Sequence, residues 1–290
     1  DLSVGSAGMT DRALLLDARE KFLGNVLDGL LLQDRDGVPS NADKDNKRSV
    51  RIAQRMADLI GEVVSGPRLA GQTSGSKFEV LCCSFLKESF GYLQHLRPGN
   101  WEIALHGTIE RFQQYLHLAD ITRKVRPDPE LAPVVQWDYG IKPDITISRL
   151  PEPDDVINSP AIIVDGCTGI RGDIRKSYST APILHACISC KWTLRSDRAQ
   201  NARIEGINLT RNRRGHQPHF VVITGDPLPS RIASIAIGTG EIDCVYHFAL
   251  KELEHAVALE DGGDACELLR IMVEGKRLKD ITDLPLDIAV

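Results

Sequence analysis

A carboxylate and a lysine stand on two separate segments of the sequence that both have the pattern of a β-strand. Asp144 follows Pro143 in the first segment, and Lys191 comes near the end of the second, after Ser189 and Cys190. Mg²⁺ binds one or two carboxylates together with water and phosphate oxygens, and a lysine stabilises negative charge at a phosphate. These residue types predict metal-dependent phosphodiester hydrolysis. The alternative for Lys191 is a lysine that reaches solvent from an edge strand.

The second carboxylate that such a site needs is missing from its most usual place. That place is two residues before the lysine, where this chain has Ser189, a weak metal ligand. Glu205 lies 14 residues after Lys191 in a segment that we predict to be helical. A helix that packs back over the strand would bring Glu205 to the strand end. The alternative is a glutamate on a solvated helix surface, paired with nearby arginines.

The seven cysteines do not form a recognisable metal or disulfide framework. Cys187 and Cys190 have C-x-x-C spacing, but no second pair accompanies them, and residues three apart on a strand face opposite sides. We interpret both as small core residues rather than as zinc ligands or a redox pair. An odd, scattered set of cysteines is typical of reduced thiols, so we expect a cytoplasmic location.

The composition is that of a globular protein of 290 residues, with 42% apolar and 26% charged residues. It excludes a disordered chain, and no apolar run approaches the length of a membrane span. The first residues lack the basic and apolar regions of a signal peptide. We expect Met9 to be the natural start, with residues 1–8 a tag or a disordered extension.

Positive charge is concentrated in one segment of an otherwise acidic chain. The net charge is −5, but the stretch from Lys191 to Arg214 contains seven basic residues and only two acidic ones. Such a local excess is typical of a confined surface that faces phosphates.

The hydrophobic periodicity predicts strands in the second half of the chain, flanked by helices. That arrangement favours one α/β or α+β domain. We expect strands at 139–149, 161–164, 183–192, 219–224, 231–237 and 241–248. We expect helices at 11–32, 50–60, 78–93, 197–212 (with Ser196 as N-cap), 249–259 and 264–274, and loops at 33–48 and 64–76.

Several long runs of this sequence resemble the NgoMIV-like family of type II restriction endonucleases, within the PD-(D/E)XK nuclease superfamily. The likeness is spread over the chain from about residue 20 and is densest from 183 to 250. It is carried by ISCKWTLRSDRAQNARIEGINLTRNR (188–213), SNAD (40–43), GQTSG…FE (71–79), PLPSR (227–231), GTGEIDCVYHFAL (238–250) and GKRLKDITDLPLDIAV (275–290).

The resemblance implies an α/β fold with a restriction-endonuclease-like core, a central mixed β-sheet flanked by helices. It implies a single nuclease domain over 9–290, in which the poorly matching 150–182 is a variable insertion. The implied enzyme cuts double-stranded DNA at GCCGGC, 5′ of the first C, and leaves a four-base overhang. It implies Mg²⁺, one or two ions per active site, and a tetramer built from two dimers. It also implies a cognate methyltransferase that acts on the same DNA site without binding this protein.

The same resemblance assigns roles to catalytic residues. Asp144 corresponds to the metal-binding aspartate and Lys191 to the catalytic lysine. Glu205 corresponds to a glutamate that replaces the missing acidic residue, and Glu79 to an additional active-site carboxylate. The metal ligands it implies are Asp144, Glu205 and the backbone carbonyl of Cys190.

A second group of residues is assigned to DNA recognition. Arginine pairs with guanine O6 and N7 in the major groove, and a carboxylate accepts from cytosine N4. The cluster Arg195-Ser196-Asp197-Arg198 stands at the beginning of the helix expected at 197–212. The alternative for this cluster is a helix-capping aspartate with flanking salt bridges. By resemblance, Arg195, Asp197 and Arg198 read the central CCGG, Asp43 and Arg231 read the outer G·C pair, and Gln72 reaches the minor groove.

Two other functions fit some of these residues. A structure-specific or repair nuclease of the same superfamily would keep Asp144, Lys191 and Glu205 but would not need base-reading residues. A DNA-binding protein with an inactive site would bind without cutting. Mapping the ends of cleaved plasmid DNA separates the first from a restriction enzyme, and cleavage with and without Mg²⁺ decides the second.

Overall fold

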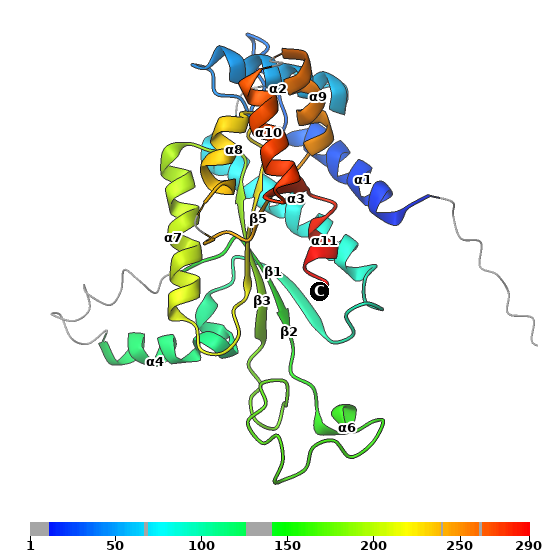
Figure 1. The fold of residues 1–290 in the computed structure, drawn as a ribbon, viewed down its shortest axis with the longest axis vertical. Helices are drawn as coiled ribbons and strands as arrows, with labels where there is room; N and C mark the ends of the chain where they lie inside the picture. The colour runs from blue at the N-terminus through cyan, green and yellow to red at the C-terminus, as the bar shows by residue number, and fades with distance from the viewer. Residues whose placement is uncertain (1–11, 67–68, 126–140, 239, 261–262) are drawn as a thin grey trace, which may run out of the picture.

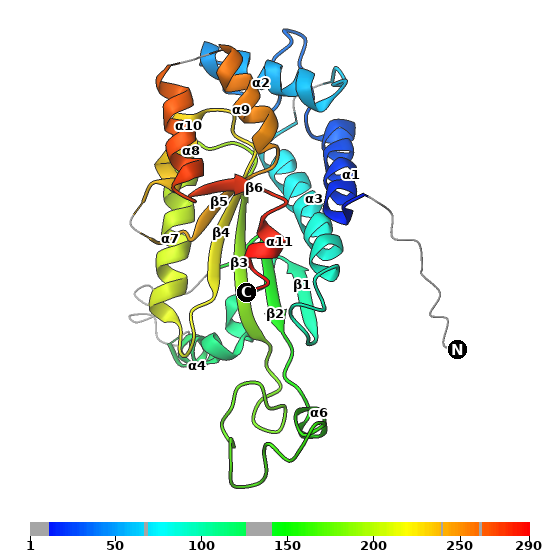
Figure 2. The same cartoon turned by 45° about the vertical axis from the view of Figure 1, so that its right-hand side comes forward.

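A single mixed sheet forms the centre of the computed structural model, which describes residues 12–66, 69–125, 141–238, 240–260 and 263–290 (Figures 1 and 2). In these ranges six strands lie in the order β1-β2-β3-β4-β5-β6. The first three are antiparallel, and β3 to β6 are parallel. This sheet confirms the predicted fold class. The strands are β1 (Trp101–Leu105), β2 (Ile145–Arg149), β3 (Ile183–Lys191), β4 (His219–Thr224), β5 (Cys244–His247) and β6 (Leu278–Asp280).

Helices cover both faces of this sheet. On one face α3 packs against β1 and β3, with α1 outside it, and α7 lies on the other face (Figure 2). The helices are α1 (Leu14–Gly29), α2 (Lys47–Ile60), α3 (Gly71–Gly91), α4 (Leu116–Val125), α6 (Asp154–Ile157), α7 (Ser196–Asn212), α8 (Pro229–Ala236), α9 (Leu250–Glu260), α10 (Asp264–Glu274) and α11 (Leu284–Asp287), with short 3-10 turns η1 (Ile109–Arg111) and η2 (Gln113–Tyr115).

The strand that carries the lysine is buried along almost its whole length. Between its two ends every residue of β3 is buried, as expected for a strand covered on both faces. Just beyond its end, the ring of Trp192 packs 5.1 Å from that of Phe78 on α3 and 5.3 Å from that of Phe248. This aromatic cluster joins α3 to the end of β3 and so fixes the place where the two elements meet.

Two predicted strands are wrong. Residues 161–164 are an exposed loop, in which the side chain of Asn158 accepts the backbone N–H groups of Ile163 and Val164. Residues 231–236 belong to α8, which Pro229 begins at its first turn. The β-branched residues there suggested a strand, but the buried Ile232, Ile235 and Ala236 have helical spacing.

Other boundaries also differ from the sequence prediction. The glycine- and serine-rich stretch at 71–77 is the first part of α3 rather than a loop, and it already contributes the buried Ser74. Ser196 is the first residue of α7, whereas Arg195 is the N-cap and makes no side-chain capping bond. The short strands β1 and β6 were not expected. The structure does not describe residues 1–8 or Met9, so the expectations for them fall outside its described residues. The same holds for the beginning of the strand expected at 139–149.

The segment 150–182 projects from the end of the sheet below β2 and β3 (Figures 1 and 2). It is organised around the buried side chain of Arg175, which donates to Asp154 at 2.6 and 2.9 Å and to the carbonyl of Thr168 at 2.8 Å. That this segment is an insertion in one nuclease domain over 9–290 stays a prediction. Within the described ranges, no helix is both long and apolar enough to cross a membrane.

Candidate active site

Asp144 meets the end of β3 because β2 and β3 are antiparallel and Ile145 lies opposite Ile188. Its carboxylate Oδ2 accepts the backbone N–H of Cys190 at 2.7 Å and contacts Lys191 Nζ at 3.2 Å. The backbone carbonyl of Asp144 accepts the N–H of His106 at 3.0 Å. The aspartate is therefore held from both sides, by its main chain and by its side chain.

Lys191 is not a lysine on an edge strand. β3 lies between β2 and β4, and only 15% of the Lys191 side chain is exposed. Burial lowers the pKa of this ammonium, but the carboxylates of Asp144 and Glu205 more than offset the effect and raise it above its ordinary value. The side chain thus stays positively charged in a cleft that it shares with carboxylates.

Glu205 lies at the end of β3, which is the first of the two interpretations that its spacing left open. The hydroxyl of Ser189 donates to Glu205 Oε2 at 3.0 Å and lies 3.5 Å from Asp144 Oδ2. Burial raises the pKa of Glu205, while Lys191 and the Ser189 hydroxyl act in the opposite direction. The alternative of a solvated glutamate paired with arginines is wrong. Ser189, which stands where an acidic residue is usual, instead links the two carboxylates.

A glycine next to Glu205 allows α7 to lie close to the sheet. A Cβ atom on Gly206 would lie 2.5 Å from the carbonyl oxygen of Glu241 and 2.8 Å from the ring of Phe220 on β4. Such contacts are too short for any larger residue. The close approach at Gly206 therefore sets how far Glu205 reaches over the strand end.

Glu79 faces the same site from α3. Its Oε2 lies 3.5 Å from Nε2 of His106, and burial, followed by the charge of Asp144, raises its pKa. His106 has a positive φ of 54°, which is uncommon for a residue other than glycine and is frequent at functional sites. The sequence analysis missed His106, because β1, which leads to it, gave no clear strand pattern.

These residues line one cleft of about 390 Å³ between α3, α7 and the ends of β2 and β3. The cleft unites the predicted catalytic residues with two of the predicted DNA-binding residues, Gln72 and Arg198. Its lining is Gly71, Gln72, Gly75, Ser76, Glu79, His106, Asp144, Cys190, Lys191, Trp192, Arg198, Asn201 and Glu205.

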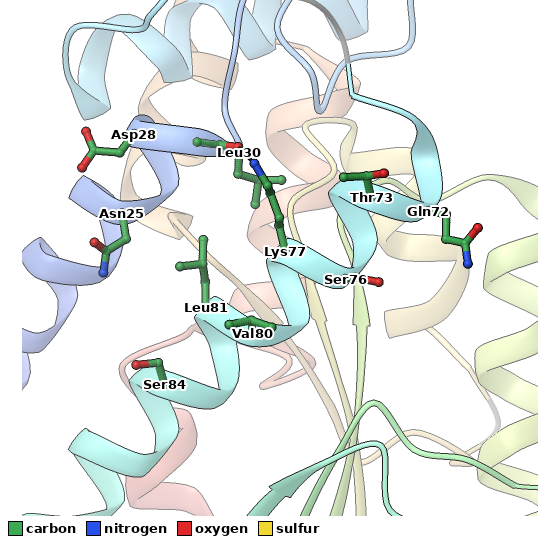
Figure 3. Close-up of a pocket in the computed structure, with 11 residues that line it drawn as sticks. Asn25, Asp28, Leu30, Gln72, Thr73, Ser76, Lys77, Val80, Leu81 and Ser84 are labelled. Atoms are coloured by element: carbon green, nitrogen blue, oxygen red, sulfur yellow. Dashed lines mark hydrogen bonds between the residues drawn. The ribbon is translucent and has the colours of Figure 1, made fainter.

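A second, larger groove of about 850 Å³ lies between α1 and α3 (Figure 3). Val80 and Leu81 form part of its floor, and none of the four predicted catalytic side chains reaches it. Figure 3 shows Gln72 at the beginning of α3, on the side away from α1. Gln72 lines both hollows, so the first turn of α3 separates this groove from the cleft.

The donor set of the cleft fits a hard divalent cation. Asp144, Glu205 and Glu79 supply carboxylate oxygens to the cleft that also holds the ammonium of Lys191, and burial is the main cause of the raised pKa values of both glutamates. The described residues hold no ready-made group of three or more His, Cys, Asp or Glu ligands. That is compatible with Mg²⁺, which completes its shell with water and phosphate oxygens. All seven cysteines are free thiols, and Cys187 and Cys190 are buried, as we predicted.

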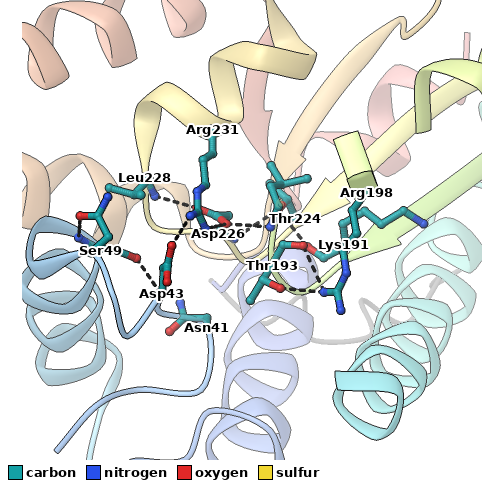
Figure 4. Close-up of polar contacts among 12 residues, drawn as sticks. Asn41, Asp43, Ser49, Lys191, Thr193, Arg198, Thr224, Asp226, Leu228 and Arg231 are labelled. Atoms are coloured by element: carbon teal, nitrogen blue, oxygen red, sulfur yellow. Dashed lines mark hydrogen bonds and ion pairs between the residues drawn. The ribbon is translucent and has the colours of Figure 1, made fainter. Parts of the chain in front are cut away.

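The other predicted DNA-binding residues do not line this cleft. Arg195 and Asp197 are exposed at the beginning of α7, and Arg198 donates to Thr193 Oγ1 at 2.7 Å. Arg231 extends from α8 to form an ion pair with Asp43 (Figure 4). Burial raises the pKa of Asp43, but Arg231, the backbone N–H of Asp45 and Arg195 together hold that pKa below its ordinary value.

A model of the NgoMIV restriction enzyme family matches residues 23–290. The chain belongs to the NgoMIV restriction enzyme family. The type II restriction enzyme NgoMIV of Neisseria gonorrhoeae is 50% identical over 283 residues, which cover 96% of this chain and 99% of that enzyme. Membership of the NgoMIV family confirms the resemblance and makes this chain a type II restriction endonuclease, a site-specific nuclease.

Two solved structures of other restriction endonucleases are similar in outline. The restriction endonuclease PspGI in complex with substrate DNA is 15% identical, with a TM-score of 0.38, and the match covers 95% of this chain and 92% of the PspGI chain. Bse634I with cognate DNA is 14% identical, with a TM-score of 0.39, and the match covers 83% of this chain and 92% of the Bse634I chain. At TM-scores this low they add nothing to the assignment, which rests on the NgoMIV family match.

The close approach of α7 predicts that Gly206→Ala harms both stability and cleavage. The added methyl group must displace α7 from Glu241 and Phe220, which costs about 1–3 kcal/mol of unfolding free energy, and the shift moves Glu205 away from Ser189. Urea unfolding and DNA cleavage rates measure the two effects. Gly24→Ala in α1 is the control, because its Cβ would meet nothing within 4 Å. We expect Gly24→Ala to cut DNA at the wild-type rate and to gain up to about 1 kcal/mol of unfolding free energy. Wild-type stability and cleavage by Gly206→Ala would show that α7 can move away from β4 without cost and would contradict this prediction.

Proposed function

We propose that this restriction endonuclease depends on Mg²⁺ and cleaves double-stranded DNA at a palindromic, GC-rich site with a CCGG core. The proposed site is GCCGGC, cut 5′ of the first C to leave a four-base 5′ overhang. The observation that carries the metal dependence is that the Ser189 hydroxyl joins Asp144 to Glu205 at the end of β3 while Lys191 contacts Asp144. The family relationship supports the sequence of the site.

The residues of the cleft divide the work of hydrolysis. Asp144, Glu205 and the backbone carbonyl of Cys190 would hold Mg²⁺, and a bound Mg²⁺ activates water and offsets phosphate charge. Lys191 stays protonated and stabilises the negative charge that develops on the phosphate. Glu79 adds a further carboxylate on the α3 side of the cleft. Water is the nucleophile, and no residue here forms a covalent intermediate.

Base reading falls to residues that surround the cleft. Arg195, Asp197 and Arg198 read the central CCGG, which their place at the beginning of α7 supports. Asp43 and Arg231 read the outer G·C pair. Their ion pair supports this role, because it places a carboxylate for cytosine N4 beside a guanidinium for guanine. Gln72 reaches the minor groove from the first turn of α3.

A palindromic site requires two copies of this cleft. One subunit cuts one strand, and a two-fold dimer matches the symmetry of the DNA. We further propose that two such dimers form a tetramer. A cognate methyltransferase would protect the same DNA site without binding this protein, and the pair would act in the cytoplasm of a bacterium.

Replacement of either charged residue at the end of β3 should abolish cutting but keep specific binding. We expect Asp144→Ala and Lys191→Ala each to lower the cleavage rate by about 10²–10³-fold or more. Specific binding in Ca²⁺ should persist, because both residues lie at the end of β3 rather than among the proposed base readers at the beginning of α7. Asp58→Ala, which removes an exposed carboxylate on α2, is the control.

Mapping the cut ends on plasmid DNA with and without Mg²⁺ tests the recognition site and the metal dependence together. Near-wild-type cutting by either variant would refute the active-site assignment, and ends scattered over many sequences would point to a structure-specific nuclease.

Asp197 provides the sharpest test of base reading. If its carboxylate accepts from cytosine N4, Asp197→Ala should lose roughly 1–3 kcal/mol of preference for the G·C site over one changed to A·T at that pair. Competition binding in Ca²⁺ measures this preference. Arg211→Ala, at the far end of α7, is the comparison, because a phosphate contact weakens binding to every sequence alike. If Asp197→Ala keeps the full preference, the residue only stabilises the first turn of its helix.

A tetramer predicts cooperation between DNA sites. A plasmid with two sites should be cut faster than a plasmid with one, and a short duplex that carries the site should stimulate cutting of the one-site plasmid when added in trans. Both rates are read from gels of timed digests. Equal rates without stimulation would favour an independent dimer.

A further inference from the structure

Asp226 is a fully buried carboxylate that follows β4, outside the cleft itself. Its Oδ2 accepts the N–H of Leu194 at 2.7 Å, and its Oδ1 accepts the N–H of Leu228 at 3.0 Å. Oδ2 also lies 3.7 Å from Nη1 of Arg231 (Figure 4). A buried charge is costly unless it is paired and hydrogen-bonded. Here each contact is made to a segment that carries proposed base readers.

The first two contacts fix the starts of two recognition helices. Leu194 directly precedes Arg195, the N-cap of α7, and Leu228 is the N-cap of α8, which carries Arg231. The carboxylate of Asp226 thus holds the main chain at both helix starts. A neutral amide could accept from only one of the two N–H groups, because its nitrogen would face the other.

The third contact concerns charge. Arg231 lies between Asp226 and Asp43, with which it forms its other ion pair. When Asp43 turns to a cytosine, Asp226 remains as the fixed negative partner of the guanidinium. It therefore keeps Arg231 oriented at the moment at which the outer base pair is read.

The same turn is bound to the catalytic strand and to the loop of Asp43. The hydroxyl of Thr224 and the N–H of Gly225 both donate to the carbonyl of Lys191, at 2.9 and 3.1 Å. The side chain of Asn41 donates to the carbonyl of Gly225 at 2.9 Å. The N–H of Asp226 in turn donates to Thr224 Oγ1 at 3.2 Å.

We propose that Asp226 is a positioning residue for sequence specificity, which holds Arg231 in place to read the outer base pair of the DNA site. This inference rests on the proposed function of Arg231 and Asp43. It assigns to Asp226 no contact with DNA and no part in hydrolysis.

The test compares Asp226→Asn with the wild type in competition binding. The competitors are a GCCGGC duplex, one changed at the outer pair and one changed in the central CCGG. Measurements at pH 8 in Ca²⁺ keep the carboxylate ionised, since burial raises the pKa of Asp226 to about 6. We expect Asp226→Asn to lose roughly tenfold of its discrimination at the outer pair, because Arg231 loses its charged partner. The loss at the central pairs should be smaller, because the amide oxygen can still accept the N–H of Leu194 before α7.

A double-mutant cycle shows whether Asp226 acts through Arg231. In an Arg231→Ala background, Asp226→Asn should cause no further loss at the outer pair. An equal loss with and without Arg231 would overturn the proposal, and so would unchanged outer-pair discrimination in Asp226→Asn alone.

Asp280 offers a matched control for stability. It is also buried, and its carboxylate accepts two backbone N–H groups, those of Leu250 and Thr282, together with the guanidinium of Arg19. Asp280→Asn should lower the melting temperature and leave discrimination unchanged. If it lowers outer-pair discrimination as Asp226→Asn does, the effect is general instability and the inference fails. A wild type without any outer-pair preference would instead refute the proposed function of Arg231 and Asp43, and the inference with it.

Discussion

The ion pair between Lys191 and Asp144 is the constraint on which the rest of the site depends. β3 is covered on both faces, so the charge at its end must be compensated by protein groups rather than by bulk water. Asp144 supplies that compensation because the antiparallel register of β2 brings it to the Cys190 N–H as well as to the ammonium. Glu205 and Glu79 bring two further carboxylates into the same cleft, and such a set of oxygen donors fits a divalent cation.

The sequence predicts this part of the molecule well because the relevant signals are local. The buried run of β3 and the neighbouring β4 have the apolar patterns of central strands, and a lysine at the end of such a strand needs a partner. Glu205 is a different case. The position of Glu205 at the strand end depends on how closely α7 packs on the sheet. That distance in turn depends on the contact of Gly206 with Phe220. Spacing along the chain leaves that distance open, so here the sequence offered two interpretations and only the fold distinguished them.

The errors in the fold have a common physical origin. In α8, β-branched residues favour a strand by intrinsic preference, yet burial of Ile232 and Ile235 on one face stabilises a helix. At the start of α3 the local composition misleads in the opposite direction, because glycine and serine suggest a loop. The burial of Ser74 and Phe78, four residues apart, instead stabilises a helix there. Pairs far apart in the sequence lie beyond any local signal. Asp43 and Arg231 are separated by 188 positions, and only the resemblance to the NgoMIV family suggested that they act together.

The proposed catalytic and base-reading residues share one short stretch of main chain at the carboxyl ends of β3 and β4. The carbonyl of Lys191 accepts from Thr224 and Gly225, and three residues beyond Lys191 the N–H of Leu194 is held by Asp226. Arg195 comes four residues after Lys191, so the strand that aligns this lysine also aligns the first of the proposed base readers. If these residues act as proposed, a misplaced base would strain the same stretch of main chain that positions Lys191. This arrangement gives a physical route by which an incorrect sequence lowers the rate of cutting as well as the strength of binding.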